Sequence, residues 1–205
     1  MASGTIFFPD AWGRGVSFGG MTISTQLQIP TLETARLRLR GHQHEDFPQL
    51  AAMWSEPEVF RYISGKPSTE QQSWARLLNY LGHWSLMGFG YWAVQEKATG
   101  RFIGEAGFAD FKREMSPSIK GIPELGWALA THAHGKGYAT EAVRAAIQWG
   151  DANLKSPRTV CIIGPENLAS IRVAEKCGFT EIQRTTYAGQ PTILYSRDAV
   201  DFNAK

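Results

Sequence analysis

The stretch that decides the fold runs from Ala133 to Thr140 and reads Ala-His-Gly-Lys-Gly-Tyr-Ala-Thr. Upstream, Glu124–Ala130 has the alternating apolar pattern of a strand, and downstream, apolar residues recur at helical spacing from Tyr138 to Asn153. A strand that turns through two glycines into a helix leaves free backbone N–H groups aimed into one small space, where the helix dipole adds partial positive charge. Gly135 and Gly137 permit positive φ and close approach of a ligand. The turn therefore predicts a site for a phosphate or diphosphate.

Two well-known phosphate loops do not match this turn. A P-loop needs Gly, four residues and then Gly-Lys-Ser/Thr, and the chain contains no such string. The dinucleotide fingerprint needs a third glycine three residues after Gly137, where this chain has Thr140. For Gly-Lys-Gly alone, a turn that only caps a helix remains the alternative.

A second motif follows some 30 residues later. The segment from Asn167 to Phe179 comes directly after a predicted strand, Arg158–Ile163, and a Gly-Pro pair. Asn167 is a good N-cap, and Ser170 falls in the first turn of the helix that it opens. Gly178 stands where a C-terminal glycine ends such a helix.

The pairing of these two motifs resembles the GNAT superfamily of N-acetyltransferases. Leu32–Arg40 is similar to that superfamily's first strand. Ser55–Tyr62 is similar to its first inter-helix loop, in the branch of the ribosomal-protein N-terminal acetyltransferases. The resemblance implies acetyl-CoA as the coenzyme and a primary amine as acceptor, either a protein N-terminus or a small molecule, which attacks the thioester directly. A non-catalytic acyl-CoA-binding module of the same fold is the alternative.

The resemblance also implies a set of coenzyme-binding residues. These are Leu129, Ala130, His132, His134, Gly135, Lys136, Gly137, Tyr138, Ala139, Thr140, Asn167, Ser170 and Arg172. The amides around Leu129 and Ala130, where the family bulges its strand, are the expected oxyanion donors. Lys136 and Arg172 are expected to meet the 3′-phosphate, with solvated surface charge as the alternative.

The catalytic groups are predicted in the same way. Many members of the superfamily carry a tyrosine acid four residues before the glycine that ends the Asn-x-x helix, and this chain has Ala174 there. Ser170 is the expected replacement, and a hydroxyl that only satisfies its own helix start is the alternative. Glu124 is the preferred base because it lies on the strand that supplies the oxyanion amide, and Glu105 is the second candidate.

Together these segments predict one GNAT-like α/β domain over residues 26–200, with an N-terminal extension at 1–25 and a short tail at 201–205. The expected sheet is mixed, mostly antiparallel and seven-stranded, with about four flanking helices. At 205 residues and 43% apolar content, the chain has enough material for a full core.

Composition and charge indicate which classes of partner the protein is not expected to bind. A net charge of +2 with no basic run gives no case for nucleic acid, and no stretch is apolar for long enough to cross a membrane. Two cysteines make no disulfide framework, which favours a cytoplasmic location, and two loose His-x-His pairs do not indicate a metal. Apolar residues before Met21 suggest an arm, and homodimerisation through it is a further hypothesis.

Overall fold

The computed structural model describes residues 28–200. The strands are β1 (Leu32–Glu33), β2 (Leu37–Arg40), β3 (Tyr91–Glu96), β4 (Phe102–Ala109), β5 (Glu124–Leu129), β6 (Arg158–Ile163), β7 (Thr180–Tyr187) and β8 (Gln190–Asp198). The helices are α1 (Phe47–Met53), α2 (Pro57–Phe60), α3 (Glu70–Met87), α4 (Tyr138–Asn153) and α5 (Leu168–Lys176), with 3₁₀ turns η1 (His44–Asp46) and η2 (Thr131–Ala133). The extension and the tail lie outside the described residues.

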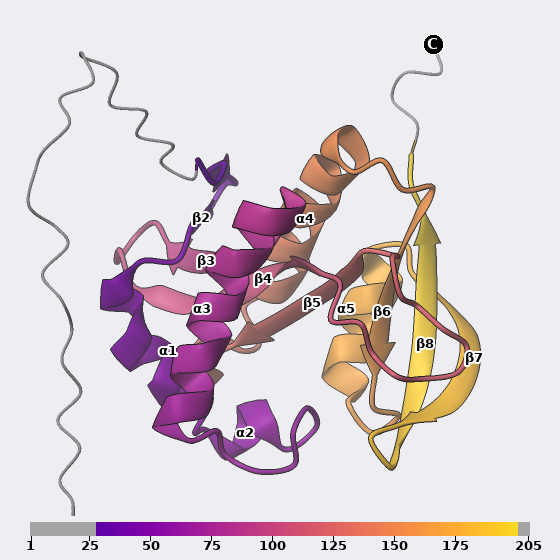
Figure 1. The fold of residues 1–205 in the computed structure, drawn as a ribbon. Coiled ribbons are helices and arrows are strands. Elements are labelled where there is room, and N and C mark those ends of the chain that lie inside the picture. Colours follow the sequence, from indigo (N-terminus) through magenta and orange to yellow (C-terminus); the bar gives the residue numbers. More distant parts are fainter. Residues whose placement is uncertain (1–27, 201–205) are drawn as a thin grey trace, which may run out of the picture.

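All eight strands form one sheet in the order β1-β2-β3-β4-β5-β6-β8-β7. Every neighbouring pair is antiparallel except β5 and β6, which run parallel. Figure 1 shows α1 and α3 in front of the β2–β4 half of the sheet, and the connection that leads into β5 crossing in front of β8 and β7. Among residues 28–200, every helix is too short or too polar to span a bilayer.

The predicted fold class is confirmed, with small differences in the count of elements. The sheet has eight strands instead of seven, because Leu32 and Glu33 form a short edge strand against β2. There are five α-helices instead of about four, since Pro57 begins a single turn, α2, with Glu56 as its N-cap. Elements this short carry no periodicity, so pattern reasoning does not detect them.

The helix α3 begins with a capping box formed by Thr69 and Gln72, one residue beyond Ser68 and Gln71, which stand at the same spacing. Its apolar residues include Trp74 and Leu78, yet their exposed fractions are 37% and 49%. The residues that α3 buries are Ser73, Leu77, Tyr80 and Trp84. The stripe includes Tyr80, whose hydroxyl donates to a buried carboxylate of the sheet, described below.

Two hydrophobic clusters cover the two faces of the sheet. One joins α1 and α3 to the sheet through residues such as Leu50, Leu77 and Ala128. The other joins α4 and α5 to the sheet and includes Val143, Ala174 and both cysteines, which are buried and unpaired as the composition indicated. Trp84, Trp92 and Trp149 make edge-to-face contacts with centroids 4.8–5.4 Å apart. Trp84 and Trp92 are thus core residues.

Candidate active site

The predicted site lies at the carboxyl ends of two inner strands of the sheet. These strands, β5 and β6, run parallel, so both end on the same side of the molecule. The chain leaves β5 through η2 and the Gly135–Gly137 turn into α4, and it leaves β6 through Asn167 into α5. The two motifs, about 30 residues apart in sequence, are therefore neighbours in space. Ligands of sheets with parallel strands commonly bind at such a carboxyl edge.

The strands β5 and β6 pair at a single point. Their one register pair is Glu124 with Val160, where the Val160 amide also donates to the Pro123 carbonyl at 3.1 Å. Beyond this point the strands diverge toward the edge with the two motifs (Figure 1). The rest of the β5 edge therefore has no strand partner on that side within the described residues, and its peptide groups are available to a ligand.

The Gly-Lys-Gly turn has the backbone conformation that its glycines indicated. Gly135 has φ of 74° and Gly137 has φ of 78°, and Gly137 is the N-cap of α4 without any side-chain cap. The first intrahelical bond runs from the Glu141 amide to the Gly137 carbonyl at 3.1 Å. The amides of the cap and first turn (Gly137, Tyr138, Ala139 and Thr140) precede that bond and have no intrahelical partner. These donors at the positive end of a 16-residue helix fit an anion.

The other residues predicted around this turn differ in their surroundings. His132, Lys136 and Arg172 are exposed. The His134 ring makes a hydrogen bond from Nε2 to the Leu129 carbonyl at 2.8 Å, which ties the turn to the end of β5. His134 therefore shapes the loop, whereas the exposed cations on the rim are free to meet an anion.

The start of α5 is built as predicted. The Asn167 side chain accepts from the Ser170 amide at 3.1 Å and caps the helix. Ser170 lies one turn before Ala174 and so on the same side of α5. Ala174 is fully buried against the core, which leaves no space for a tyrosine at this position. Ser170, half-buried at the helix start, is the one residue of α5 that carries a hydroxyl.

One of the two expected oxyanion donors on β5, the Ala130 amide, needs correction. The strand pairs with β4 in unbroken register from Gly104–Leu129 to Ala109–Glu124, so the expected bulge is absent. The Ala130 amide donates to the Ile103 carbonyl at 2.9 Å and is not available to a ligand. Because N–H groups alternate between the two edges of a strand, the amides of Trp127 and Leu129 point toward β6. These two are the free donors.

Glu124, the preferred base, is held in a two-pronged ion pair. Arg113 donates to its two carboxylate oxygens at 2.6 and 2.8 Å. The guanidinium also lies over the rings of Phe111 and Tyr187, each centroid 4.8 Å away. The carboxylate is 6% exposed and Arg113 is 20% exposed, so the pair is largely removed from water. Glu124 is thereby fixed in place at the point where β5 and β6 begin to diverge.

The Glu124 carboxylate and the Leu129 amide, which were expected to act on the same carbonyl group, lie far apart along β5. Glu124 and Leu129 are five residues apart, which is about 17 Å in an extended strand. They cannot both contact the same reacting carbonyl. The Trp127 amide, two residues closer to Glu124 on the same edge, is the better candidate for an oxyanion donor, and the Leu129 amide remains available to the coenzyme's arm.

Glu105, the second candidate, lies in a different environment. It is 1% exposed, beneath α1 and α3, and accepts hydrogen bonds from the Tyr80 hydroxyl and from Trp54 Nε1 at 3.2 Å. Burial raises the pKa of Glu105 to about 7, although the charge of Arg76 and these hydrogen bonds act to lower it. Its Oε2 has no hydrogen-bond partner among residues 28–200. Glu105 has a proton affinity suited to a base but no open path to a substrate.

The buried Glu105 should make stability depend on pH. Between about pH 5 and 7 the folded protein keeps a proton that the unfolded chain has released, so the free energy of unfolding should fall as pH rises, by up to about 3 kcal/mol from this group. Glu105→Gln should remove that slope. Denaturant titrations at about pH 5 and 8 measure it, and parallel pH dependence in both proteins would show that Glu105 does not titrate in this range.

The structure adds residues that the sequence did not single out. Arg113 stands in a loop without periodicity, and its partner is eleven residues away. The Glu56 carboxylate accepts from the Thr131 amide at 2.7 Å and from its hydroxyl, which anchors the loop before α2 at the end of β5. Arg113 belongs to no motif, and Glu56 lies in the Ser55–Tyr62 segment without a role assigned to it there, so only the tertiary structure shows their partners.

A comparison with protein families places these features in a known group. The model described as "Acetyltransferase (GNAT) domain" matches residues 36–180. The chain belongs to the GNAT family. It is an acetyltransferase, and the resemblance drawn from its motifs is confirmed.

Curated and solved GNAT relatives agree with this assignment. The chain is 31% identical over 173 residues to the FsC-acetyl coenzyme A-N(2)-transacetylase of Aspergillus fumigatus, which covers 80% of this chain and 69% of that one. A GnaT-family acetyltransferase structure from Bordetella pertussis is 31% identical with a TM-score of 0.74, over 82% of this chain and 99% of that one. The ribosomal-protein-S5-alanine acetyltransferase of Vibrio fischeri shares the fold at 20% identity, with a TM-score of 0.68 over 85% and 100% of the chains.

Proposed function

We propose that this GNAT protein transfers the acetyl group of acetyl-CoA to a primary amine, either a protein N-terminus or a small molecule, by direct attack of the amine. The observation that carries the proposal is the single register pair between β5 and β6, which leaves the β5 edge unpaired just before an anion-binding turn. The Aspergillus relative supports it, since its name gives acetyl coenzyme A as donor and a nitrogen as acceptor.

The residues present fit the coenzyme. The free amides from Gly137 to Thr140 suit its diphosphate, and a Cβ added at Gly135 would meet nothing within 4 Å, so the turn is open to a ligand. The Leu129 amide would hold the extended arm along β5. Acetyl-CoA supplies an activated acetyl thioester, and the protein's own groups do the rest.

Proton transfer is assigned to Glu124 and Ser170. An amine is mostly protonated at neutral pH, so a base must take its proton before attack. Glu124 lies where β5 and β6 begin to diverge and would act through a water molecule, with Arg113 fixing its orientation. Ser170 would donate a hydrogen bond to the leaving thiolate from the start of α5, and the proton that the nitrogen loses as the amide forms would end on the thiol. The amide of Trp127 would stabilise the negative oxygen.

The acceptor is expected to enter between two connections. The Ser55–Lys66 segment is tied to the end of β5 through Glu56 and lies near the end of β6, where a Cβ on Gly164 would be 3.6 Å from the Tyr62 carbonyl oxygen. The connection from β4 to β5 carries Arg113, whose partner is the proposed base. Loops of this kind commonly determine specificity.

A panel of amines tests the proposal. Purified protein with acetyl-CoA should release free thiol in the presence of a suitable peptide N-terminus, polyamine or amino acid, and the acetylated product should be identified by mass spectrometry. Binding of acetyl-CoA without thiol release for any amine would contradict the transfer and leave a binding module.

Ser170→Ala should slow turnover by about tenfold. The effect should be smaller than the hundredfold or more expected of a fully used acid, because a thiolate leaves tolerably well without help. The affinity for acetyl-CoA should change little, since the Asn167 cap bonds the Ser170 amide and not its hydroxyl. Steady-state kinetics with saturating acetyl-CoA measure the effect. Unchanged turnover would mean that the Ser170 hydroxyl has no catalytic role and serves only the start of the helix.

A further inference from the structure

The Gly135–Gly137 turn has little packing to hold its shape. Both glycines are exposed, and a Cβ at Gly135 would meet nothing within 4 Å. A Cβ at Gly137 would have one neighbour within 4 Å, the Arg36 Nη2 atom at 3.6 Å. Glycines with so much freedom do not keep one conformation on their own. Polar contacts must therefore set the direction of the peptides in this turn.

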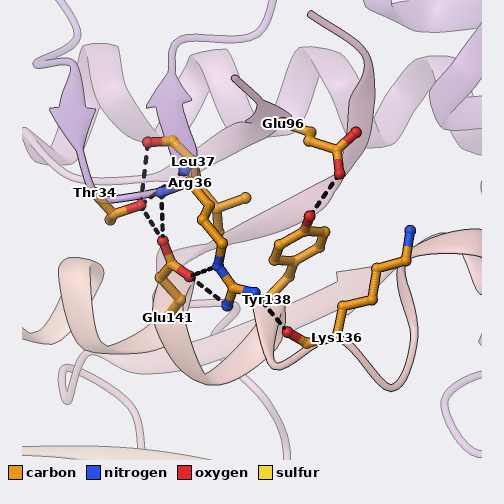
Figure 2. Close-up of polar contacts among 7 residues, drawn as sticks. All are labelled: Thr34, Arg36, Leu37, Glu96, Lys136, Tyr138 and Glu141. Atoms are coloured by element: carbon orange, nitrogen blue, oxygen red, sulfur yellow. Dashed lines mark hydrogen bonds and ion pairs between the residues drawn. The ribbon is translucent and has the colours of Figure 1, made fainter. Parts of the chain in front are cut away.

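Arg36, the residue just before β2, supplies such contacts (Figure 2). Its Nη1 donates to the Lys136 carbonyl at 2.9 Å, between the two glycines. Its Nε donates to Glu141 Oε2 at 2.7 Å, and the guanidinium lies 4.6 Å from the centre of the Tyr138 ring. One planar side chain thus touches the turn and the first turn of α4 together.

The partners of Arg36 are themselves fixed to the sheet. Glu141 Oε1 accepts from the Thr34 hydroxyl at 2.6 Å and from the Arg36 amide at 2.9 Å. The Tyr138 hydroxyl donates to Glu96 Oε1, at the end of β3, at 2.6 Å. Figure 2 shows these contacts converging on the first turn of α4. The guanidinium is therefore held in one orientation.

We infer that Arg36 is a positioning residue for the coenzyme's diphosphate. A trans peptide is planar, so the Lys136 carbonyl and the Gly137 N–H point in opposite directions. By holding that carbonyl, Arg36 aims the Gly137 N–H away from β2 and into the turn, where the diphosphate would bind. It also neutralises Glu141, whose negative charge lies one turn from the anion. The inference rests on the function proposed above.

Affinity measurements with matched variants test this role. Arg36→Ala should weaken acetyl-CoA binding about ten- to a hundredfold in calorimetry, the loss expected for one charge-assisted hydrogen bond. Turnover at saturating acetyl-CoA should change little, because the reacting groups lie elsewhere on β5 and α5. The Arg36 side chain is 48% exposed, so the fold should survive its loss. Arg36→Lys should bind weakly as well, since an ammonium lacks the fork that reaches both partners.

Arg38→Ala is the control. Arg38 lies two residues further along, within β2, is 50% exposed and pairs with Glu33, but does not touch the turn. The affinity of the Arg38→Ala variant for acetyl-CoA should match that of the unmodified protein. If Arg36→Ala binds equally tightly, or if Arg36→Lys restores full affinity, the positioning role is wrong while the proposed function stands. If the unmodified protein itself fails to bind acetyl-CoA, the proposed function fails.

Discussion

Glu124→Gln should lower turnover by about a hundred- to ten-thousandfold, the range supplied by a positioned base. The amide cannot take a proton from the attacking amine, although it keeps nearly the shape of the carboxylate. Binding of acetyl-CoA should change little, because the proposed diphosphate site lies at the other end of β5. Single-turnover kinetics across pH, with calorimetry for the coenzyme, separate the two effects.

The ion pair with Arg113 calls for a second variant, since losing either partner of a buried pair also lowers stability. Arg113→Met keeps an unbranched side chain but removes the guanidinium that lies over Phe111 and Tyr187, which frees the carboxylate. If Glu124 is the base, Arg113→Met should keep turnover within about tenfold. Equal losses in both variants would mean that the pair is structural. If Glu124→Gln keeps full activity and Glu105→Gln loses it, the general base is Glu105.

Gly137→Val should weaken acetyl-CoA binding by at least about a hundredfold. A β-branched residue is strained at φ of 78°, so the chain would leave this conformation and carry the first amides of α4 with it. The turn is exposed, so the rest of the fold should persist. Calorimetry with acetyl-CoA and circular dichroism of the free protein provide the two measurements.

Gly100→Val is the matched control. Gly100 has φ of 69°, lies in the turn between β3 and β4, and a Cβ there would meet nothing within 4 Å. The same strain should therefore cost similar stability with no change in affinity for acetyl-CoA. An equal loss of affinity in both variants would trace the effect to strain in general and not to the diphosphate site.

The sequence alone determined where several helices and strands begin and which family the chain resembles. The helices Tyr138–Asn153 and Leu168–Lys176 begin where a glycine and an asparagine indicated, because caps act on neighbouring residues. The strands β5 and β6 begin at Glu124 and Arg158 as their patterns predicted. Two motifs in order were enough to indicate the family. All of these signals lie within a few residues of the element that they specify.

Tertiary structure decided which groups meet. The pairing of Arg113 with Glu124, the engagement of the Ala130 amide by Ile103 and the burial of Glu105 each join segments that no local pattern relates. The sequence placed Glu124 and the Leu129 amide in one cleft, whereas the extended strand holds them about 17 Å apart. Arg36 reaches Lys136 across 100 positions of sequence. Pairing partners and distances depend on how strands and helices pack, and that packing is a property of the whole chain.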